Sequence, residues 1–189
     1  RAIMANLNYS NTRNSISNMV TYDEKTGGRT TRPENINGNW NIAGGFMFNT
    51  ALDSVGRWNV NTHTTLRYNN YVNYLSIDRT SDSQKNTTRT TTLGERLAGS
   101  YRIDWLEVEL DGSMNYTHTK NLLQSENDLD TWQFAYGGTI NIYLPWGTSI
   151  STDMHQNSRR GYNDDAANTN ELIWNAQISQ GFLKGKALN

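Results

Sequence analysis

The sequence predicts an all-β chain, folded as an antiparallel up-and-down meander of about eight strands. Three observations support this. Apolar and polar residues alternate in many segments, the links between these segments are alternately short and long, and Asn and Thr supply about a quarter of the 189 residues while Pro occurs only twice. A period of two places the two sets of side chains on opposite faces of a strand. We find no apolar stripe with helical spacing.

The clearest expected strand is Leu106–His118, whose even positions are mostly apolar and whose odd positions are polar. Thr131–Leu144 has the same pattern, so both strands present one apolar and one polar face. The other alternating segments lie around Ile3–Tyr9, Trp40–Phe48, Trp58–Tyr68, Leu93–Ile103, Ile150–Met154 and Leu172–Phe182. A ninth strand is expected to begin near the C-terminus.

The links between these strands differ in length in a regular way. Short links are expected near Leu52–Gly56, Asp104–Trp105, Pro145–Gly147 and Leu183–Lys186, and long polar links near Asp23–Asn35, Asp78–Thr92, Lys120–Asp130 and Asn157–Thr169. Every second link is therefore short. A meander with tight turns at one end and long loops at the other is typical of bacterial outer-membrane barrels.

The two tightest turns predict a register. A two-residue turn at Asp104–Trp105 places Ile103 opposite Leu106 on the apolar face and Arg102 opposite Glu107 on the polar face. The same reasoning around Pro145–Gly147 pairs Leu144 with Thr148 and Ile142 with Ile150. Slipping either hairpin by one residue would invert its faces, so this agreement favours the register.

The length of the strands and the polarity of their two faces favour a section of a transmembrane barrel over a soluble sheet. Several alternating segments exceed ten residues, whereas soluble strands usually have about 5 or 6 residues and a tilted membrane strand needs about 9 to 11. Glu107, Glu109 and Asp111 form a row of carboxylates which, with Arg102, we expect to face a wet lumen. The tryptophans beside the short turns are expected at the periplasmic membrane interface: Trp58, Trp105 and Trp146.

Composition excludes several classes of protein. The net charge of -1 means that there is no excess of basic residues to favour nucleic-acid binding. The lack of Cys excludes disulfide scaffolds and thiolate metal sites. No apolar run approaches the roughly 18 to 20 residues of a membrane helix. We expect residues 1–189 to be one barrel segment, an internal piece of a longer polypeptide without its signal peptide, and we expect no cofactor.

Support for catalysis is weak. Ser149, Ser151, Asp153 and His155 share one strand face, but alternate residues on a strand are about 7 Å apart, too far for a catalytic triad. Only a partner from a distant strand would make His155 part of an enzyme site.

For the other candidate sites, a binding role competes with a simpler interpretation as solvent-exposed residues. The carboxylate row could hold a cation, but a hydrated wall partly neutralised by Arg102 and Arg96 is the preferred interpretation. The remaining candidates are loop or strand-end residues: Asp164 and Asp165 lack calcium-loop spacing, Arg159 and Arg160 could meet anionic lipid or only aid solubility, and Ser81–Thr92 could recognise a nutrient or partner.

Specific segments resemble a known family. They are Thr31–Trp40 (TRPENINGNW), Asp104–Gly112 (DWLEVELDG), Tyr143–Asp153 (YLPWGTSISTD), Arg159–Tyr162 (RRGY) and Asn170–Lys186 (NELIWNAQISQGFLKGK). Together the chain resembles the C-terminal barrel portion of TonB-dependent receptor-like outer-membrane proteins. The resemblance implies a parent protein with a 22-stranded barrel, an N-terminal plug and a segment contacted by the TonB complex. The plug and that segment are not part of these residues.

The resulting hypothesis is a non-catalytic section of the barrel wall of a nutrient receptor in the bacterial outer membrane. Its expected partners are outer-membrane lipid, the plug of the parent chain, the TonB complex through the parent protein, and an unidentified nutrient. Two alternatives stay open: a self-contained eight-stranded outer-membrane barrel acting as an adhesin or structural protein, and a soluble carbohydrate-binding β-domain.

Overall fold

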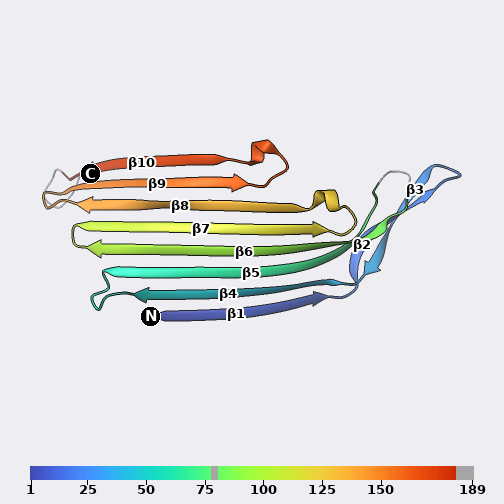
Figure 1. Cartoon of the computed structure of the whole chain (residues 1–189), viewed down its shortest axis with the longest axis horizontal. Coiled ribbons are helices and arrows are strands. Elements are labelled where there is room, and N and C mark those ends of the chain that lie inside the picture. The colour runs from blue at the N-terminus through green and yellow to red at the C-terminus, as the bar shows by residue number, and fades with distance from the viewer. Residues whose placement is uncertain (78–80, 182–189) are drawn as a thin grey trace.

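A single antiparallel sheet of eight strands dominates the computed structural model, which describes residues 1–77 and 81–181 (Figure 1). Its strands follow the order β1-β4-β5-β6-β7-β8-β9-β10, and a hairpin of β2 and β3 forms a second, two-stranded sheet. The strands are β1 (Ala2–Thr12), β2 (Ser15–Asp23), β3 (Gly28–Ile36), β4 (Asn39–Ala51), β5 (Trp58–Leu75), β6 (Gln84–Ile103), β7 (Leu106–Asn121), β8 (Leu129–Tyr143), β9 (Thr148–Arg160) and β10 (Asn170–Gln180). The predicted all-β antiparallel meander is therefore confirmed.

The eight-stranded sheet is open. In the described part of the chain, β1 pairs with β4 and β10 pairs with β9, and these two strands lie at opposite edges of the sheet (Figure 1). All eleven residues of β1 are exposed. The expected ninth strand and the short link at Leu183–Lys186 lie outside the described residues.

The two predicted hairpin registers are confirmed. Around Asp104–Trp105, Ile103 pairs with Leu106 and Arg102 pairs with Glu107. Around Pro145–Gly147, Ile142 pairs with Ile150, and the Leu144 amide donates to the Thr148 carbonyl at 2.8 Å. Because alternation sets the face of every residue, the two faces of the whole sheet follow from these pairings.

The long links are more ordered than the sequence analysis expected. The predicted link at Asp23–Asn35 is wrong, because these residues include the turn and most of β3 in the β2–β3 hairpin. Val20 of this hairpin exchanges backbone and side-chain hydrogen bonds with Ser83, and the Ser17 hydroxyl accepts from the Tyr74 amide. These contacts hold the hairpin beside the end of β5 that is distal to the short turns (Figure 1).

The other long links also contain strand. Of the predicted link Asp78–Thr92, residues from Gln84 onward belong to β6, so the expected recognition loop Ser81–Thr92 is mostly sheet. Thr and other β-branched residues suit a pleated strand even where apolar alternation is lost. β9 continues to Arg160, and the loops after β7 and β9 each contain one short 3-10 turn, Ser125–Asn127 and Asp165–Ala167.

The sheet has almost no core. Of the described apolar side chains only Ile36 and Val72 are buried, and they lie where the hairpin meets β5. The chain exposes 13297 Å², whereas a compact monomer of 21.5 kDa would expose about 9200 Å². A single layer therefore leaves both faces of the sheet open. None of the described segments forms a helix of the length and apolarity needed to cross a membrane.

Candidate functional site

One face of the eight-stranded sheet is apolar from edge to edge, and we call it the apolar face. The register places on it Ile3, Leu7, Phe46, Val60, Leu66, Leu93, Leu97, Leu110, Phe134, Ile140, Met154, Leu172 and Trp174, among others. These side chains are not covered: Leu7 is 76% exposed, Leu110 64% and Trp174 70%. A contiguous exposed apolar surface of this extent marks a face that meets lipid or another protein.

Aromatic side chains bound this face at the end with the short turns. Trp58 stacks at an angle on Tyr101 with ring centroids 4.4 Å apart, and Trp105 and Trp146 lie in the turns themselves. All three predicted interfacial tryptophans are more than half exposed. An aromatic ring with a polar edge suits the boundary between an apolar layer and water.

A second aromatic row, which the sequence analysis did not single out, lies at the opposite end. Trp40 contacts Tyr9 and Tyr68 at 6.3 and 5.1 Å between centroids, and Tyr116 contacts Trp132 at 4.3 Å. All five belong to the apolar face. Tyr9 and Tyr116 are the last aromatic residues of their face before a long link, and Trp40 and Trp132 are the first after one. That position was the available signal in the sequence.

One carboxylate interrupts the apolar face. Glu95 lies opposite Thr64 and Met114, one row inside the aromatic row that contains Tyr116. The Thr64 hydroxyl donates to its carboxylate at 2.6 Å. Beside it, Gly99 and Gly112 contribute no side chains and help to line an apolar hollow of about 520 Å³. The bond from Thr64 partly compensates the loss of water around Glu95.

The opposite face is polar and carries the predicted carboxylate row. Glu107 pairs with Arg102 through an ion pair in which Glu107 is 16% exposed and Arg102 67% exposed. Glu109 lies opposite Ser100 in the register. Arg96, also expected to neutralise the row in part, lies opposite Ser113, one row beyond Asp111 on the same face. The described side-chain contact of Asp111 is to a histidine.

That histidine is His155 of β9, which reaches across β8. The register places Asp111, Gly137 and His155 in one row, and the imidazole Nε2 lies 3.3 Å from the Asp111 carboxylate. This contact requires glycine at position 137, since a Cβ there would lie 2.5 Å from His155 Cδ2 and would also overlap the Met154 carbonyl oxygen. The sequence analysis missed the pair because its members are 44 residues and two strands apart.

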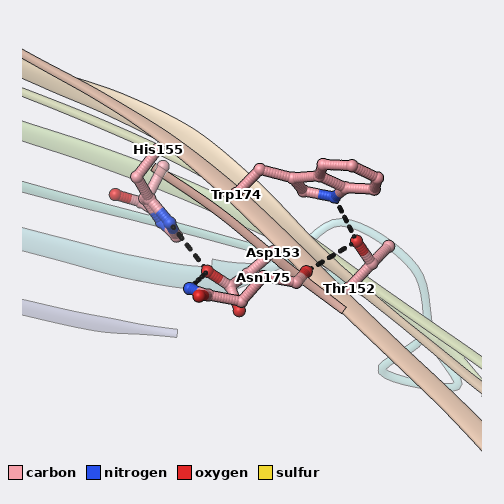
Figure 2. Close-up of polar contacts among 6 residues, drawn as sticks. Thr152, Asp153, His155, Trp174 and Asn175 are labelled. Atoms are coloured by element: carbon pink, nitrogen blue, oxygen red, sulfur yellow. Dashed lines mark hydrogen bonds and ion pairs between the residues drawn. The ribbon is translucent and has the colours of Figure 1, made fainter. Parts of the chain in front are cut away.

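The contacts continue onto the edge strand β10. His155 Nδ1 lies 3.7 Å from Asp153, which accepts a hydrogen bond from the Asn175 side chain at 3.0 Å (Figure 2). On the apolar face the Trp174 indole donates to Thr152 at 2.8 Å, and Thr152 donates to the Asn175 carbonyl (Figure 2). β10 is therefore tied to β9 by side chains on both faces.

This arrangement joins His155 to carboxylates and not to a nucleophile. Ser151 donates its hydroxyl to Asn141 at 2.6 Å, and Ser149 lies opposite Ser179. Activation of a hydroxyl by His155 would need that hydroxyl within hydrogen-bond reach of the imidazole. A second histidine, His118, also contacts a carboxylate, Asp130, at 2.8 Å, on the face that carries Tyr116.

The carboxylates of the turns and loops accept hydrogen bonds from nearby residues of the same turn or loop. Asp164 accepts from the Ala166 amide and so caps the second 3-10 turn, which accounts for one of the two candidate calcium ligands. The Trp58 amide donates to Asp53, and this bond keeps the pKa of the Asp53 carboxyl below its usual value. The Thr26 hydroxyl and the Lys25 amide lower the pKa of Asp23 in the same way.

Metal chemistry finds no support in this arrangement. Within residues 1–77 and 81–181, no group of three or more His, Asp or Glu side chains is placed to hold a metal ion. Arg159 and Arg160 end β9 with exposed side chains, Arg159 on the polar face and Arg160 opposite Trp132 on the apolar face. The functional feature that remains is the contrast between the two faces of the sheet.

Models of known protein families, curated protein sequences and solved structures give no match to this chain.

Proposed function

We propose that this chain is a section of the wall of a bacterial outer-membrane β-barrel, with the apolar face toward lipid and the polar face toward an aqueous lumen. The observation that carries this proposal is the exposed apolar face, continuous over eight strands and bounded at both ends by aromatic rows. A soluble sheet would have to cover these side chains, since their burial is the main favourable term in its folding.

The dimensions of the apolar face support the proposal. On β7 it extends from Leu106 to Tyr116, ten residues later. At about 3.3 Å per residue this is roughly 33 Å along the strand. A tilt of about 40° from the membrane normal reduces it to roughly 25 Å, which is the height of the apolar band of outer-membrane barrels.

The open edges favour a larger barrel over a complete small one. Within residues 1–77 and 81–181, β1 and β10 each have one edge without a pairing strand, and such an unpaired row of backbone donors and acceptors is costly in hydrocarbon. We infer that neighbouring strands continue the sheet at both edges. In the self-contained alternative β1 would instead pair with β10.

The resemblance of the chain to TonB-dependent receptor-like proteins supports a more specific function. In that proposal the parent protein imports a nutrient, the polar face contacts the plug, and the segments beyond the aromatic row of Tyr68 and Tyr116 help to capture the ligand. Arg102, Glu107, Glu109 and Asp111 then contact water or the plug and carry out no chemistry.

Membrane insertion tests the proposal. The chain is mixed with preformed phosphatidylcholine vesicles, in which its two open edges are expected to pair with those of other copies. The vesicles are floated on a density gradient, and tryptophan quenching by brominated phosphatidylcholine is measured. We expect co-flotation, strong quenching and a gel mobility that changes on boiling. A soluble carbohydrate-binding domain would stay at the bottom of the gradient as an unquenched monomer, and that result would refute the proposal.

A further inference from the structure

Three cations lie on the apolar side of the sheet, at the level of Trp40 of the second aromatic row and beyond it. Arg89 of β6 is directly opposite Lys120 of β7, and Lys85 lies four residues before Arg89 on the same face of β6. All three side chains are exposed. We call these three residues the cationic rim.

Among the described residues, no ion pair balances the charges of the cationic rim. Like charges directly opposite each other in a sheet repel, so this arrangement costs stability unless an anion lies between them. No carboxylate in the described part of the chain lies within ion-pairing distance of the three cations. The two nearby aspartates have other partners: Asp130 accepts from Tyr116 and contacts His118, and Asp128 accepts from the Asn121 amide.

The position of the rim indicates which anion it meets. Arg89 lies one row beyond Thr91, which is opposite Tyr68 of the aromatic row. This places Arg89 about 7 Å along the strand past Tyr68, in the register row of Trp40. Aromatic belts lie at the level of the lipid headgroups, so cations at or just outside such a belt and on the lipid-facing side meet headgroup phosphates.

We propose that Arg89 and Lys120, with Lys85, bind the phosphate of an anionic lipid headgroup in the outer leaflet. This inference rests on the proposed membrane orientation of the sheet and adds a lipid class to it. Arg supplies a planar pair of donors to a phosphate, and Lys supplies a compact charge. Asn70, opposite Arg89, and Trp40, opposite Asn70, flank the rim on the β5 side.

The test compares two brominated lipids. The chain is inserted into phosphatidylcholine vesicles that contain brominated phosphatidic acid or brominated phosphatidylcholine, and the relative affinity is taken from tryptophan quenching. Arg89→Gln with Lys120→Gln is expected to lower the preference for phosphatidic acid about tenfold. Arg96→Gln is the matched control, since it removes a cation of β6 that is exposed on the opposite face. The control is expected to retain the wild-type preference.

The readout separates this inference from the proposed function. Failure of the wild-type chain to be quenched by brominated phosphatidylcholine would refute membrane insertion itself. Normal insertion with an unchanged preference in the double variant, or an equal loss in the Arg96→Gln control, would refute only the cationic rim. Arg89→Lys is expected to keep most of the preference for phosphatidic acid. That result would exclude misfolding as the cause of the loss in the double variant. Full displacement by inorganic phosphate would contradict a site for lipid headgroups.

Discussion

Replacing Gly137 by alanine is expected to destabilise the sheet although it adds one methyl group to a half-exposed position. The new Cβ would lie 2.5 and 2.8 Å from the Cδ2 and Cγ atoms of His155 and would overlap the Met154 carbonyl oxygen. The imidazole can rotate away, but doing so breaks its 3.3 Å contact with Asp111. The carbonyl belongs to the β8–β9 ladder and can move only with the strand.

The size of the effect follows from these two conflicts. Overpacking against backbone costs about 1–3 kcal/mol. The lost contact between Asp111 and His155 adds less than about 1 kcal/mol, because both side chains are about one-third exposed and screened by solvent. Gly137→Ala is therefore expected to lower the free energy of unfolding by about 1–3 kcal/mol. Adding His155→Ala to the Gly137→Ala variant should recover only part of the lost stability, because the new Cβ still overlaps the Met154 carbonyl oxygen.

Gly112 supplies the matched control on the adjacent strand. A Cβ at this position would lie 3.8 Å from Tyr136 Cβ, which is an ordinary contact. Because alanine loses less backbone entropy than glycine, Gly112→Ala is expected to stabilise the sheet by about 0.5–1 kcal/mol. Equilibrium urea unfolding in phosphatidylcholine vesicles, followed by tryptophan fluorescence, measures both changes. If Gly137→Ala were as stable as Gly112→Ala, the proposed path of His155 across β8 would be wrong.

Two further predictions concern charges on the sheet and its turns. A double-mutant cycle with Arg102→Gln and Glu107→Gln, measured by the same unfolding assay, should give only a weak coupling, because Arg102 is largely exposed. A strong coupling would mean that the pair is shielded from solvent. Carboxyl NMR of the Asp53 turn should show a pKa below that of an unfolded aspartate. The folded pKa is the lower one, so the Asp53–Trp58 bond stabilises the turn above the unfolded pKa and this contribution is lost as the pH falls through the folded pKa. A lower protection factor for exchange of the Trp58 amide at acid pH would report the loss, and a midpoint at or above the unfolded pKa would contradict it.

The main sheet could be predicted because its register depends on local features. The two-residue turn at Asp104–Trp105 fixes the pairing of β6 with β7, and alternation then assigns every side chain to a face. The β2–β3 hairpin could not be predicted in this way. Its strands carry few apolar residues, and β3 contains Pro33, which an edge strand tolerates. What orders the hairpin is its contacts with Ser83 and β5, which are remote in sequence.

The same distinction between local and long-range features applies to the candidate site. The face of Arg102 and of the carboxylate row follows from local alternation, and the sequence predicts it. The contact of His155 with Asp111 depends on which strands are neighbours and on an empty position at Gly137, so no local pattern reveals it. The cationic rim was also missed, because Lys85, Arg89 and Lys120 fall in segments that the sequence predicted as loops or loop edges.

Cysteine scanning of β7 in lipid vesicles tests the central claim most directly. The chain has no native cysteine, so single cysteines at successive positions from Leu106 to Tyr116 can each carry one spin label. The measurement is the accessibility of each label to oxygen, which concentrates in lipid, and to a water-soluble nickel complex. We expect oxygen accessibility to peak at Leu106, Val108, Leu110 and Met114, and nickel accessibility to peak at Glu107, Glu109 and Asp111. Equal accessibility at neighbouring positions, or the opposite alternation, would contradict the assignment of the apolar face to lipid.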